Sequence, residues 1–286
     1  MIQMIFQILI STLRMSLPTL YATMGGYFSE KSGVAQIALE AFLLTGAFTA
    51  ASVTYGSKSL IFGYLMAGLV SFLMAQIFCV LVIFIGANAI VIGTGLNLFV
   101  MGVIPLVSKS VFQSTGSTPS IDVFESSTQI TVLFFIITIL FSYWISENTL
   151  WGLQMKFAGE KKQALIATGV SAKWRQWQSV SLGALITGFG GATLSTFLAS
   201  SYSPQMSAGR GFIALAAIIF SGWNLTKAMA VSLVFGFCEA LQIQAQSNAA
   251  IATHIPGEFI QMIPYLATLL ALLLFKTKNQ APKELS

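Results

Sequence analysis

Most of this chain consists of apolar runs long enough to cross a lipid bilayer, separated by short polar breaks. A helix rises about 1.5 Å per residue, so roughly 20 apolar residues match a hydrocarbon core of about 30 Å. Only 8% of the 286 residues are charged, whereas a soluble domain carries about 25%. The sequence therefore predicts an all-α integral membrane protein of the lipid bilayer. Its net charge of +5 is interpreted as membrane topology and not as nucleic-acid binding.

The polar breaks divide residues 1–286 into about nine membrane segments, which form a single transmembrane domain. One segment is short, because only about ten apolar residues lie between Gly209 and Ser221, roughly half of the core thickness. This segment is predicted to be a half-helix that ends inside the protein, with Asn224 as the cap of the next helix. The predicted full-length spans are residues 4–24, 34–55, 59–85, 88–105, 129–149, 179–200, 225–246 and 259–275.

The longest polar interruption in the second half of the chain, residues 156–178, is basic. It contains one acid, Glu160, and the cations Lys156, Lys161, Lys162, Lys173 and Arg175. The positive-inside rule places this loop and the C-terminal lysines in the cytoplasm, and the N-terminus on the opposite side. Such a loop is either a topology signal alone or a docking element for a cytoplasmic partner. It is predicted to hold a short helix from about Glu160 to Thr168, ended by Gly169, before a helix capped by Ser171.

Several polar side chains lie within the predicted spans, where an unpaired charge costs several kcal/mol. Arg14 in the first span and Glu40, about one third of the way along the second, each need a partner, most simply on a neighbouring helix. Asn97 lies in a glycine-rich span, which fits either close helix packing or the close approach of a ligand. A polar stripe along the span 225–246 suggests a translocation surface and contains Ser232, Gly236, Glu239, Gln242 and Gln246.

Catalytic and metal-binding patterns are not found in the sequence. No run of glycines ends in Lys-Ser or Lys-Thr, so ATP is not expected to bind through a P-loop. His254 is the single histidine and has no second His or Cys at metal-ligand spacing. Cys79 and Cys238 fall within predicted spans, where a thiol behaves as a small apolar group. The chain is therefore not expected to be an enzyme, or to hold a catalytic residue, a metal or a cofactor.

Two breaks in the sequence resemble each other. A helix that reaches Phe28-Ser29 is followed by a polar break and a second helix, and the same order recurs around Phe220-Ser221. Transporters often contain such internal repeats, with the substrate site near the interface between them. The sequence thus suggests, as a hypothesis, two related halves.

Three stretches of the chain match the motifs of a known family. The first, residues 17–40, contains Ser-Glu-Lys-Ser-Gly-Val where the family has Ser-Glu-Arg-Ser-Gly-Val, and departs from the following Asn-Ile-Gly-Leu-Glu-Gly at Gln36, Ala38 and Ala41. The second, residues 87–98, is similar to the family's Ala-Asn-Gln to Leu-Asn-Leu helix. The third and most specific, residues 209–224, begins Gly-Arg-Gly-Phe-Ile-Ala-Leu-Ala-Ala and ends Trp-Asn, with Leu225 in place of the usual Pro. In these stretches the chain resembles the permease subunits of ATP-binding-cassette importers for nucleosides, a branch of the simple-sugar permeases.

This resemblance implies a subunit that does no chemistry and moves its substrate by alternating access, coupled to a separate ATPase subunit. It also implies that the ATPase docks on a coupling helix that includes Gly159, Glu160 and the residues from Ala164 to Gly169. Further implied partners are a second permease, longer and not identical to this chain, and an extracytoplasmic substrate-binding protein. The implied location is the cytoplasmic (inner) membrane of a bacterium.

The candidate contacts for a nucleoside in transit are Asn97, Glu239 and Gln242, because hydroxyls and base edges need hydrogen-bond donors and acceptors. Arg14 and Glu40 are expected to be structural or gating residues. Two alternatives stay open. A permease of the ribose or galactose type fits the same intramembrane polar residues, whereas an ion-coupled secondary transporter is expected to carry clearer ion-coupling carboxylates that face one cavity.

Overall fold

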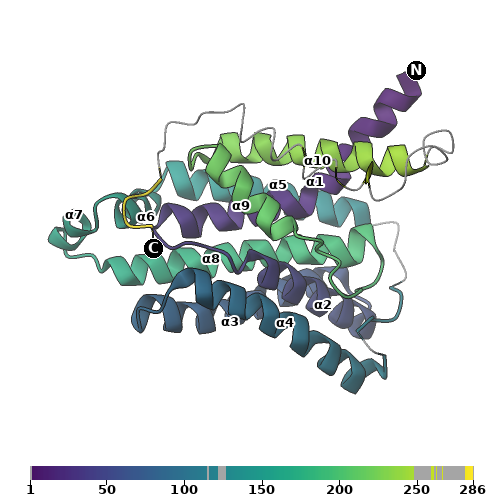
Figure 1. Ribbon diagram of the computed structural model, residues 1–286, viewed down its shortest axis with the longest axis horizontal. Coiled ribbons are helices and arrows are strands. Elements are labelled where there is room, and N and C mark those ends of the chain that lie inside the picture. The colour runs from purple at the N-terminus through teal and green to yellow at the C-terminus, as the bar shows by residue number, and fades with distance from the viewer. Residues whose placement is uncertain are drawn as a thin grey trace.

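The computed structural model describes residues 2–114, 116–121, 127–247 and 281–285, together with residues 259, 260, 262 and 266. Throughout these residues every regular element is a helix (Figure 1). Two short π-helical stretches, η1 and η2, directly continue α3 and α8. The elements are α1 (Ile2–Lys31), α2 (Leu39–Ser57), α3 (Leu60–Cys79), η1 (Val80–Phe84), α4 (Ala89–Phe112), α5 (Ser127–Glu147), α6 (Leu150–Glu160), α7 (Lys162–Ala167), α8 (Ala172–Ala192), η2 (Thr193–Leu198), α9 (Arg210–Phe220) and α10 (Leu225–Ser247).

Membrane-length helices are the main elements of the described chain. Five helical stretches are long and apolar enough to cross a membrane: Leu60–Phe84, Ala89–Phe112, Thr128–Glu147, Ala172–Leu198 and Leu225–Gln246. α9 has 11 residues, a length of about 16 Å, and this confirms the predicted half-helix. The predicted last span, residues 259–275, lies largely outside the described residues. The protein is therefore a helical membrane protein, and the count of nine segments stays a prediction.

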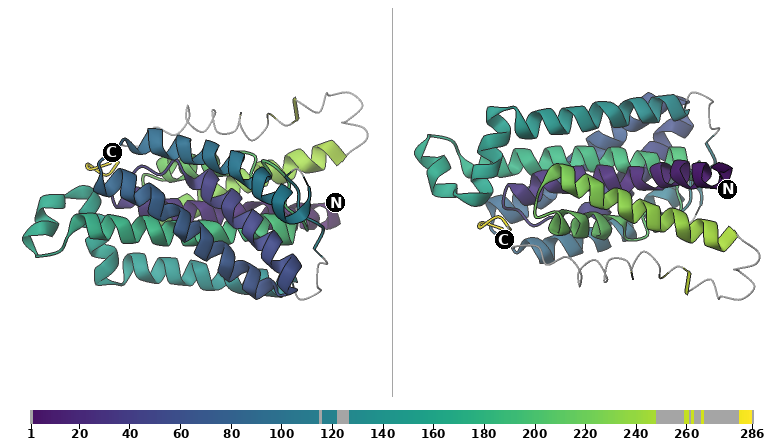
Figure 2. Two further views of the ribbon diagram at one scale, coloured as in Figure 1. Left: turned by 90° about the horizontal axis from the view of Figure 1, so that it is seen from below. Right: turned by 90° about the horizontal axis from the view of Figure 1, so that it is seen from above.

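The centre of the bundle is formed by α1, α2 and α8, which run side by side along its long axis (Figures 1 and 2). α8 packs against α1, α2 and α3, while α10 covers α1. Glycines permit this close approach, because a Cβ on Gly25 would overlap the backbone of Gly183, and one on Gly46 would overlap the backbone of Gly188. Small residues at helix contacts let backbones touch, which is how helices associate without a water-excluded core.

The first two predicted spans have the wrong boundaries. α1 continues beyond Met24 to Lys31, and α2 begins only at Leu39. The intervening residues 32–38, which we call the joint, form turns and an irregular stretch, held by local and long-range hydrogen bonds, instead of continuing a helix. Glu40 consequently lies in the first turn of α2, and not a third of the way along a span. The predicted end of the fourth span at Pro105 is also wrong, since α4 continues through this proline to Phe112.

Local capping signals were predicted more successfully than span boundaries. The backbone N–H of Trp174 donates to the Ser171 hydroxyl oxygen at 3.4 Å, so Ser171 caps α8 as predicted. The side-chain oxygen of Asn224 accepts from the N–H of Lys227 at 3.1 Å and caps α10. Gly169 follows α7 with φ +80°, the left-handed conformation expected of it. These interactions join residues only a few positions apart, and the sequence pattern reveals them directly.

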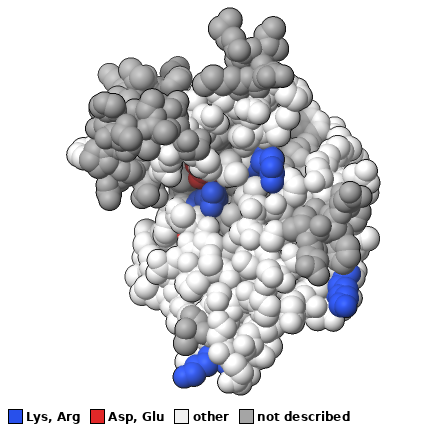
Figure 3. Space-filling view, turned by 90° about the vertical axis from the view of Figure 1, so that its right-hand side faces the viewer, with Lys and Arg blue, Asp and Glu red and all other residues white. Residues whose placement is uncertain are grey.

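The two ends of the bundle differ. α7 and residues 281–285 lie at one end, and the N-terminus lies at the other (Figure 1). The Glu284 N–H donates to the Gly159 carbonyl at 2.9 Å, so the C-terminal segment rests against the basic loop. Figure 3 faces the N-terminal end, where the surface is mostly uncharged and basic groups are separated from one another. This arrangement agrees with the prediction that the basic loop and the C-terminal segment share one side of the membrane.

Candidate functional site

The half-helix α9 begins in the protein interior, where the first backbone N–H groups of a helix need acceptors. Glu40, which is 2% exposed, supplies them. One carboxylate oxygen accepts from the Ser207 hydroxyl at 2.5 Å and from the Gly209 N–H at 2.9 Å; the other accepts from the Gly211 N–H at 2.8 Å. A negative charge at a helix N-terminus is also favoured by the helix dipole. Glu40 is therefore the N-terminal cap of α9, contributed by α2.

The other end of α9 is held by a second carboxylate, Glu30, at the end of α1. Trp223 follows α9 with φ +56°, and its backbone N–H donates to the Ile218 carbonyl to close the last turn. Its indole N–H donates to Glu30 at 3.1 Å, while the other Glu30 oxygen accepts from the Gln36 N–H at 2.8 Å. Glu30 and Glu40 thus flank the joint and hold opposite ends of α9. We call this pair the α9 clamp.

The role of Glu30 was missed by the sequence analysis, although the residue belongs to the first matched motif. The available signal was an acid two residues before the Ser32-Gly33 break, next to the resemblance between residues 28–29 and 220–221. The structure brings these two breaks together through Glu30 and Trp223. That they form related halves remains a hypothesis.

The side chain of Asn97 on α4 is hydrogen-bonded to the joint and to the first turn of α2. Its side-chain oxygen accepts from the Ala41 N–H at 2.9 Å, and its side-chain NH₂ donates to the Ile37 carbonyl at 3.0 Å. Gly93, one turn earlier, lies against Ile37, since a Cβ there would be 3.0 Å from the Ile37 side chain. Asn97 is 5% exposed. This geometry favours a role in positioning the joint and the start of α2.

Arg210 and Glu239 form an ion pair between α9 and α10. Two guanidinium nitrogens lie 3.3 and 3.4 Å from the same Glu239 oxygen, and a third donates to the Met206 carbonyl at 3.2 Å. The two side chains are 14% and 13% exposed. Gln242, one turn further along α10, is half-buried. The structure thus adds Arg210 to the predicted pair Glu239 and Gln242.

The predicted polar stripe of α10 is divided between two environments. The hydroxyls of Ser232 and Thr23 share a hydrogen bond of 2.6 Å, and a Cβ on Gly236 would overlap Ser16. This part of the stripe packs against α1. Gln246, at the other end of the stripe, is exposed. Only the part from Glu239 onward has the partial exposure expected of a substrate surface.

Arg14 does not join this group but stacks on an aromatic ring. Its guanidinium carbon lies 5.0 Å from the centre of the Phe197 ring, a cation–π contact, and the side chain is exposed. The two residues lie beside an apolar pocket of about 490 Å³ between α1, α5 and η2. The sequence predicted that Arg14 needs a partner, and in the structure this partner is the aromatic ring of Phe197.

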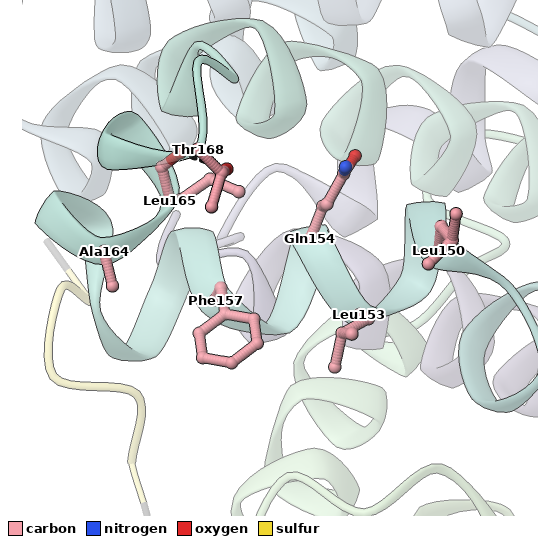
Figure 4. A pocket seen from close by; sticks show the side chains of 7 residues that line it. All are labelled: Leu150, Leu153, Gln154, Phe157, Ala164, Leu165 and Thr168. Atoms are coloured by element: carbon pink, nitrogen blue, oxygen red, sulfur yellow. Dashed lines mark hydrogen bonds between the residues drawn. The ribbon is translucent and has the colours of Figure 1, made fainter.

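The basic loop begins within α6 and contains α7, which lies where a short helix from about Glu160 to Thr168 was predicted. Glu160 ends α6 and forms an ion pair with Lys31 at 3.1 Å, and Ala164 lies within α7. Figure 4 shows side chains of both helices around a shared pocket of about 320 Å³. Its lining is mostly apolar and consists of Leu150, Leu153, Gln154, Phe157, Ala164, Leu165 and Thr168. We call the segment from α6 to Gly169 the docking loop, after the role that the sequence predicts for it.

Metal-ligating side chains do not cluster within the part of the chain that the structure describes: no three His, Cys, Asp or Glu residues there are arranged to hold a metal ion. His254 lies outside the described residues. The two cysteines, Cys79 and Cys238, are free thiols, the first buried and the second half-buried.

The bundle of membrane-length helices, with a half-helix held inside it, is that of a multi-pass membrane protein. Comparison with known proteins identifies its family. Residues 8–275 match the family described as branched-chain amino acid transport system / permease component. The chain is 30% identical to the nucleoside ABC transporter permease protein NupC of Lactococcus lactis subsp. cremoris (strain MG1363), over 94% of this chain and 92% of the relative. It is 28% identical to the guanosine ABC transporter permease protein NupQ of Bacillus subtilis (strain 168), over 99% and 96%. No solved structure matches it significantly. The chain belongs to this family of transport-system permeases.

The α9 clamp predicts that replacing Glu40 lowers the free energy of unfolding more than replacing the exposed Glu147. Glu40→Gln replaces one acceptor oxygen by an NH₂ group, so at least one buried donor of α9 loses its partner. The expected cost is about 1–3 kcal/mol, seen as a lower midpoint of thermal unfolding in detergent. Glu147→Gln is the matched control, because its ion pair with Lys156 is 41% and 27% exposed and is worth at most about 1 kcal/mol. Equal shifts for the two variants would contradict the clamp.

Proposed function

We propose that this chain is the permease subunit of an ATP-driven importer that carries nucleosides across the inner membrane of a bacterium. The observation that carries the proposal is the nearly full-length similarity to two permeases named for nucleoside and guanosine transport. The family description refers to amino acids, so the substrate class rests on these relatives and on the chemistry of the α9–α10 region. Substrate moves by alternating access, and this subunit carries out no chemistry of its own.

The ATP-binding subunit docks on the docking loop, through Gly159, Glu160, Ala164 and Gly169 with their neighbours. The features that support this assignment are an end position in the bundle, a cluster of cations and exposed apolar groups such as Ile166, which is 55% exposed. A surface of this kind suits a partner with an acidic rim and an apolar groove. A second permease, not identical to this chain, and an extracytoplasmic substrate-binding protein complete the importer.

The substrate path runs along the open part of α10, beside the N-terminal end of α9. Arg210, Glu239 and Gln242 offer donors and acceptors at partly exposed positions, as a base edge or a ribose hydroxyl requires. Asn97 and Glu40 support this path from behind, because their polar atoms hold the joint and α9. Arg14 has a structural or gating role at the Phe197 contact.

The carboxylates argue against an ion-coupled secondary transporter. Among the described residues, the buried acids Glu30 and Glu40 accept from backbone, hydroxyl and indole donors, and the half-buried Glu239 is already paired with the positive charge of Arg210. A coupling ion needs a carboxylate that is available to it. A sugar permease of the ribose or galactose type is the second candidate, and substrate competition separates it from a nucleoside permease.

The direct test is uptake of labelled guanosine, adenosine and ribose in host cells with and without this chain. We expect loss of nucleoside uptake alone in the cells that lack it, and recovery when the chain is restored. ATP depletion should abolish this uptake, whereas an ionophore that collapses ion gradients while ATP is maintained should leave it intact. Loss of ribose uptake alone would assign the protein to sugars. Uptake that follows the ion gradient would identify a secondary transporter.

Docking at this loop predicts that a change in the backbone conformation at Gly169 abolishes uptake, whereas a small added side chain does not. Proline cannot adopt φ +80°, and it removes the N–H that donates to the Ile166 carbonyl at 2.9 Å. Gly169→Pro should therefore abolish ATP-driven uptake while the chain remains in the membrane, as should deletion of residues 160–169. Gly169→Ala is the matched control: it keeps the N–H, no atom lies within 4 Å of the added Cβ, and only the strain of a positive φ remains, about 1–2 kcal/mol, so most uptake should be retained. Normal uptake by the proline variant would disprove docking at this loop.

The substrate path predicts that Glu239→Gln lowers nucleoside uptake more than membrane abundance. The amide cannot keep the ion pair with Arg210, so the polar surface offered to the substrate changes while the helix packing is retained. Uptake is compared with the amount of chain measured by quantitative immunoblotting. Gln246→Ala, on the exposed end of the same helix face, should change neither quantity. A proportional loss of protein and uptake would return Glu239 to a structural role.

A further inference from the structure

The joint touches the docking loop on one side. The Lys31 ammonium lies 3.1 Å from the Glu160 carboxylate, which ends α6. Gly159 packs directly on the joint, since a Cβ there would lie 2.9 Å from the Gly33 backbone nitrogen. α8 adds a contact, because the Gln176 side chain donates to the Ser32 carbonyl at 3.1 Å. A displacement of α6 cannot occur without moving the joint or breaking these contacts.

The joint touches the half-helix on the other side. The Gln36 N–H binds one oxygen of Glu30 at 2.8 Å, and the Trp223 indole N–H binds the other at 3.1 Å. Glu30 is 3% exposed and Trp223 7% exposed, so both bonds lie in a region of low dielectric. Glu30 is thus the single side chain in the described structure whose two oxygens join the joint backbone to the residue that ends α9.

The joint also carries an unpaired polar group. Among the described residues, neither polar atom of the Gln36 side chain has a hydrogen-bond partner, and the residue is fully buried. A buried amide without partners is costly, so this conformation of the joint is not its most favourable hydrogen-bonding arrangement.

We propose that the joint transmits movement of the docking loop to half-helix α9, with Glu30 as the positioning residue. A shift of α6 moves Lys31 and Gly33, and the joint carries Glu30 and Trp223 with it. α9 then moves against α10, where Arg210 faces Glu239. This inference rests on the proposed function, because the ATPase subunit is what displaces the docking loop. It adds the route between that subunit and the substrate path.

The test measures nucleoside uptake and ATP hydrolysis together, in proteoliposomes that contain the complete importer. Trp223→Phe removes the indole donor to Glu30 and keeps an aromatic ring. We expect ATP hydrolysis to persist and uptake per ATP to fall about fivefold or more, the size of a typical coupling between sites. Trp177→Phe is the matched control: it also loses an indole donor, to the Gln76 side chain at 2.7 Å, but lies outside the joint. Its uptake per ATP should equal that of the unmodified importer.

A second variant keeps the test decisive if Trp223→Phe does not fold. Lys31→Met removes the ion pair to Glu160 at the edge of the protein and should also lower uptake per ATP. Lys109→Met, at an exposed lysine of α4, is its control. Ratios for Lys31→Met and Trp223→Phe equal to those of their controls would overturn the inference while leaving the proposed function intact. An unmodified importer without ATP-dependent uptake would overturn both.

Discussion

A helix that stops inside a membrane protein must find partners for its terminal backbone groups, and this requirement shapes the whole molecule. α9 is only 11 residues long, so at least one of its ends lies away from bulk water. Glu40 accepts from the N–H groups at its start. Trp223 closes its last turn, and the indole of this residue is held by a hydrogen bond to Glu30. The arrangement is reciprocal, because the donors of α9 also compensate the burial of the Glu40 carboxylate. Removing either partner would leave the other unsatisfied.

The clamp depends in turn on small residues. A Cβ on Gly211 would lie 2.5 Å from the Glu40 backbone nitrogen, so α9 approaches α2 closely enough only because Gly211 has no side chain. The same logic holds where α8 contacts α1 through Gly183 and α3 through Gly188. Glycine content is therefore part of how the charged residues are positioned, and not merely of how helices associate. At α9, the hydrogen bonds to Glu40 can form only because the helix packs closely against α2.

Sequence reasoning succeeded where a structure is decided by neighbours in the chain. The length of α9 and the caps at Ser171 and Asn224 follow from apolar run length and from side chains a few residues away. It failed at the joint, because residues 32–38 are held by Glu30 within α1 and by Asn97 on α4, 60 positions from its Ile37 partner. Hydropathy assigns residues 34–38 to the second span, although the break at Ser32 and Gly33 was predicted. The same long-range contacts explain why Asn97 was interpreted as a substrate contact and why Glu30 was overlooked.

The three least exposed carboxylates, Glu30, Glu40 and Glu239, differ in the donors that hold them. This difference distinguishes residues that support the fold from the residue proposed to contact the substrate. Glu30 and Glu40 accept mainly from backbone and indole N–H groups that are fixed by the fold, at distances of 2.5–3.1 Å when the Ser207 hydroxyl is included. Glu239 is paired with the long Arg210 side chain at 3.3–3.4 Å, beyond the usual length of a charge-assisted hydrogen bond of about 2.7–2.9 Å. A partly exposed pair of this kind opens at less cost than the backbone bonds of Glu40. This difference supports the proposal that a passing polar substrate separates Glu239 from Arg210 without disrupting α9.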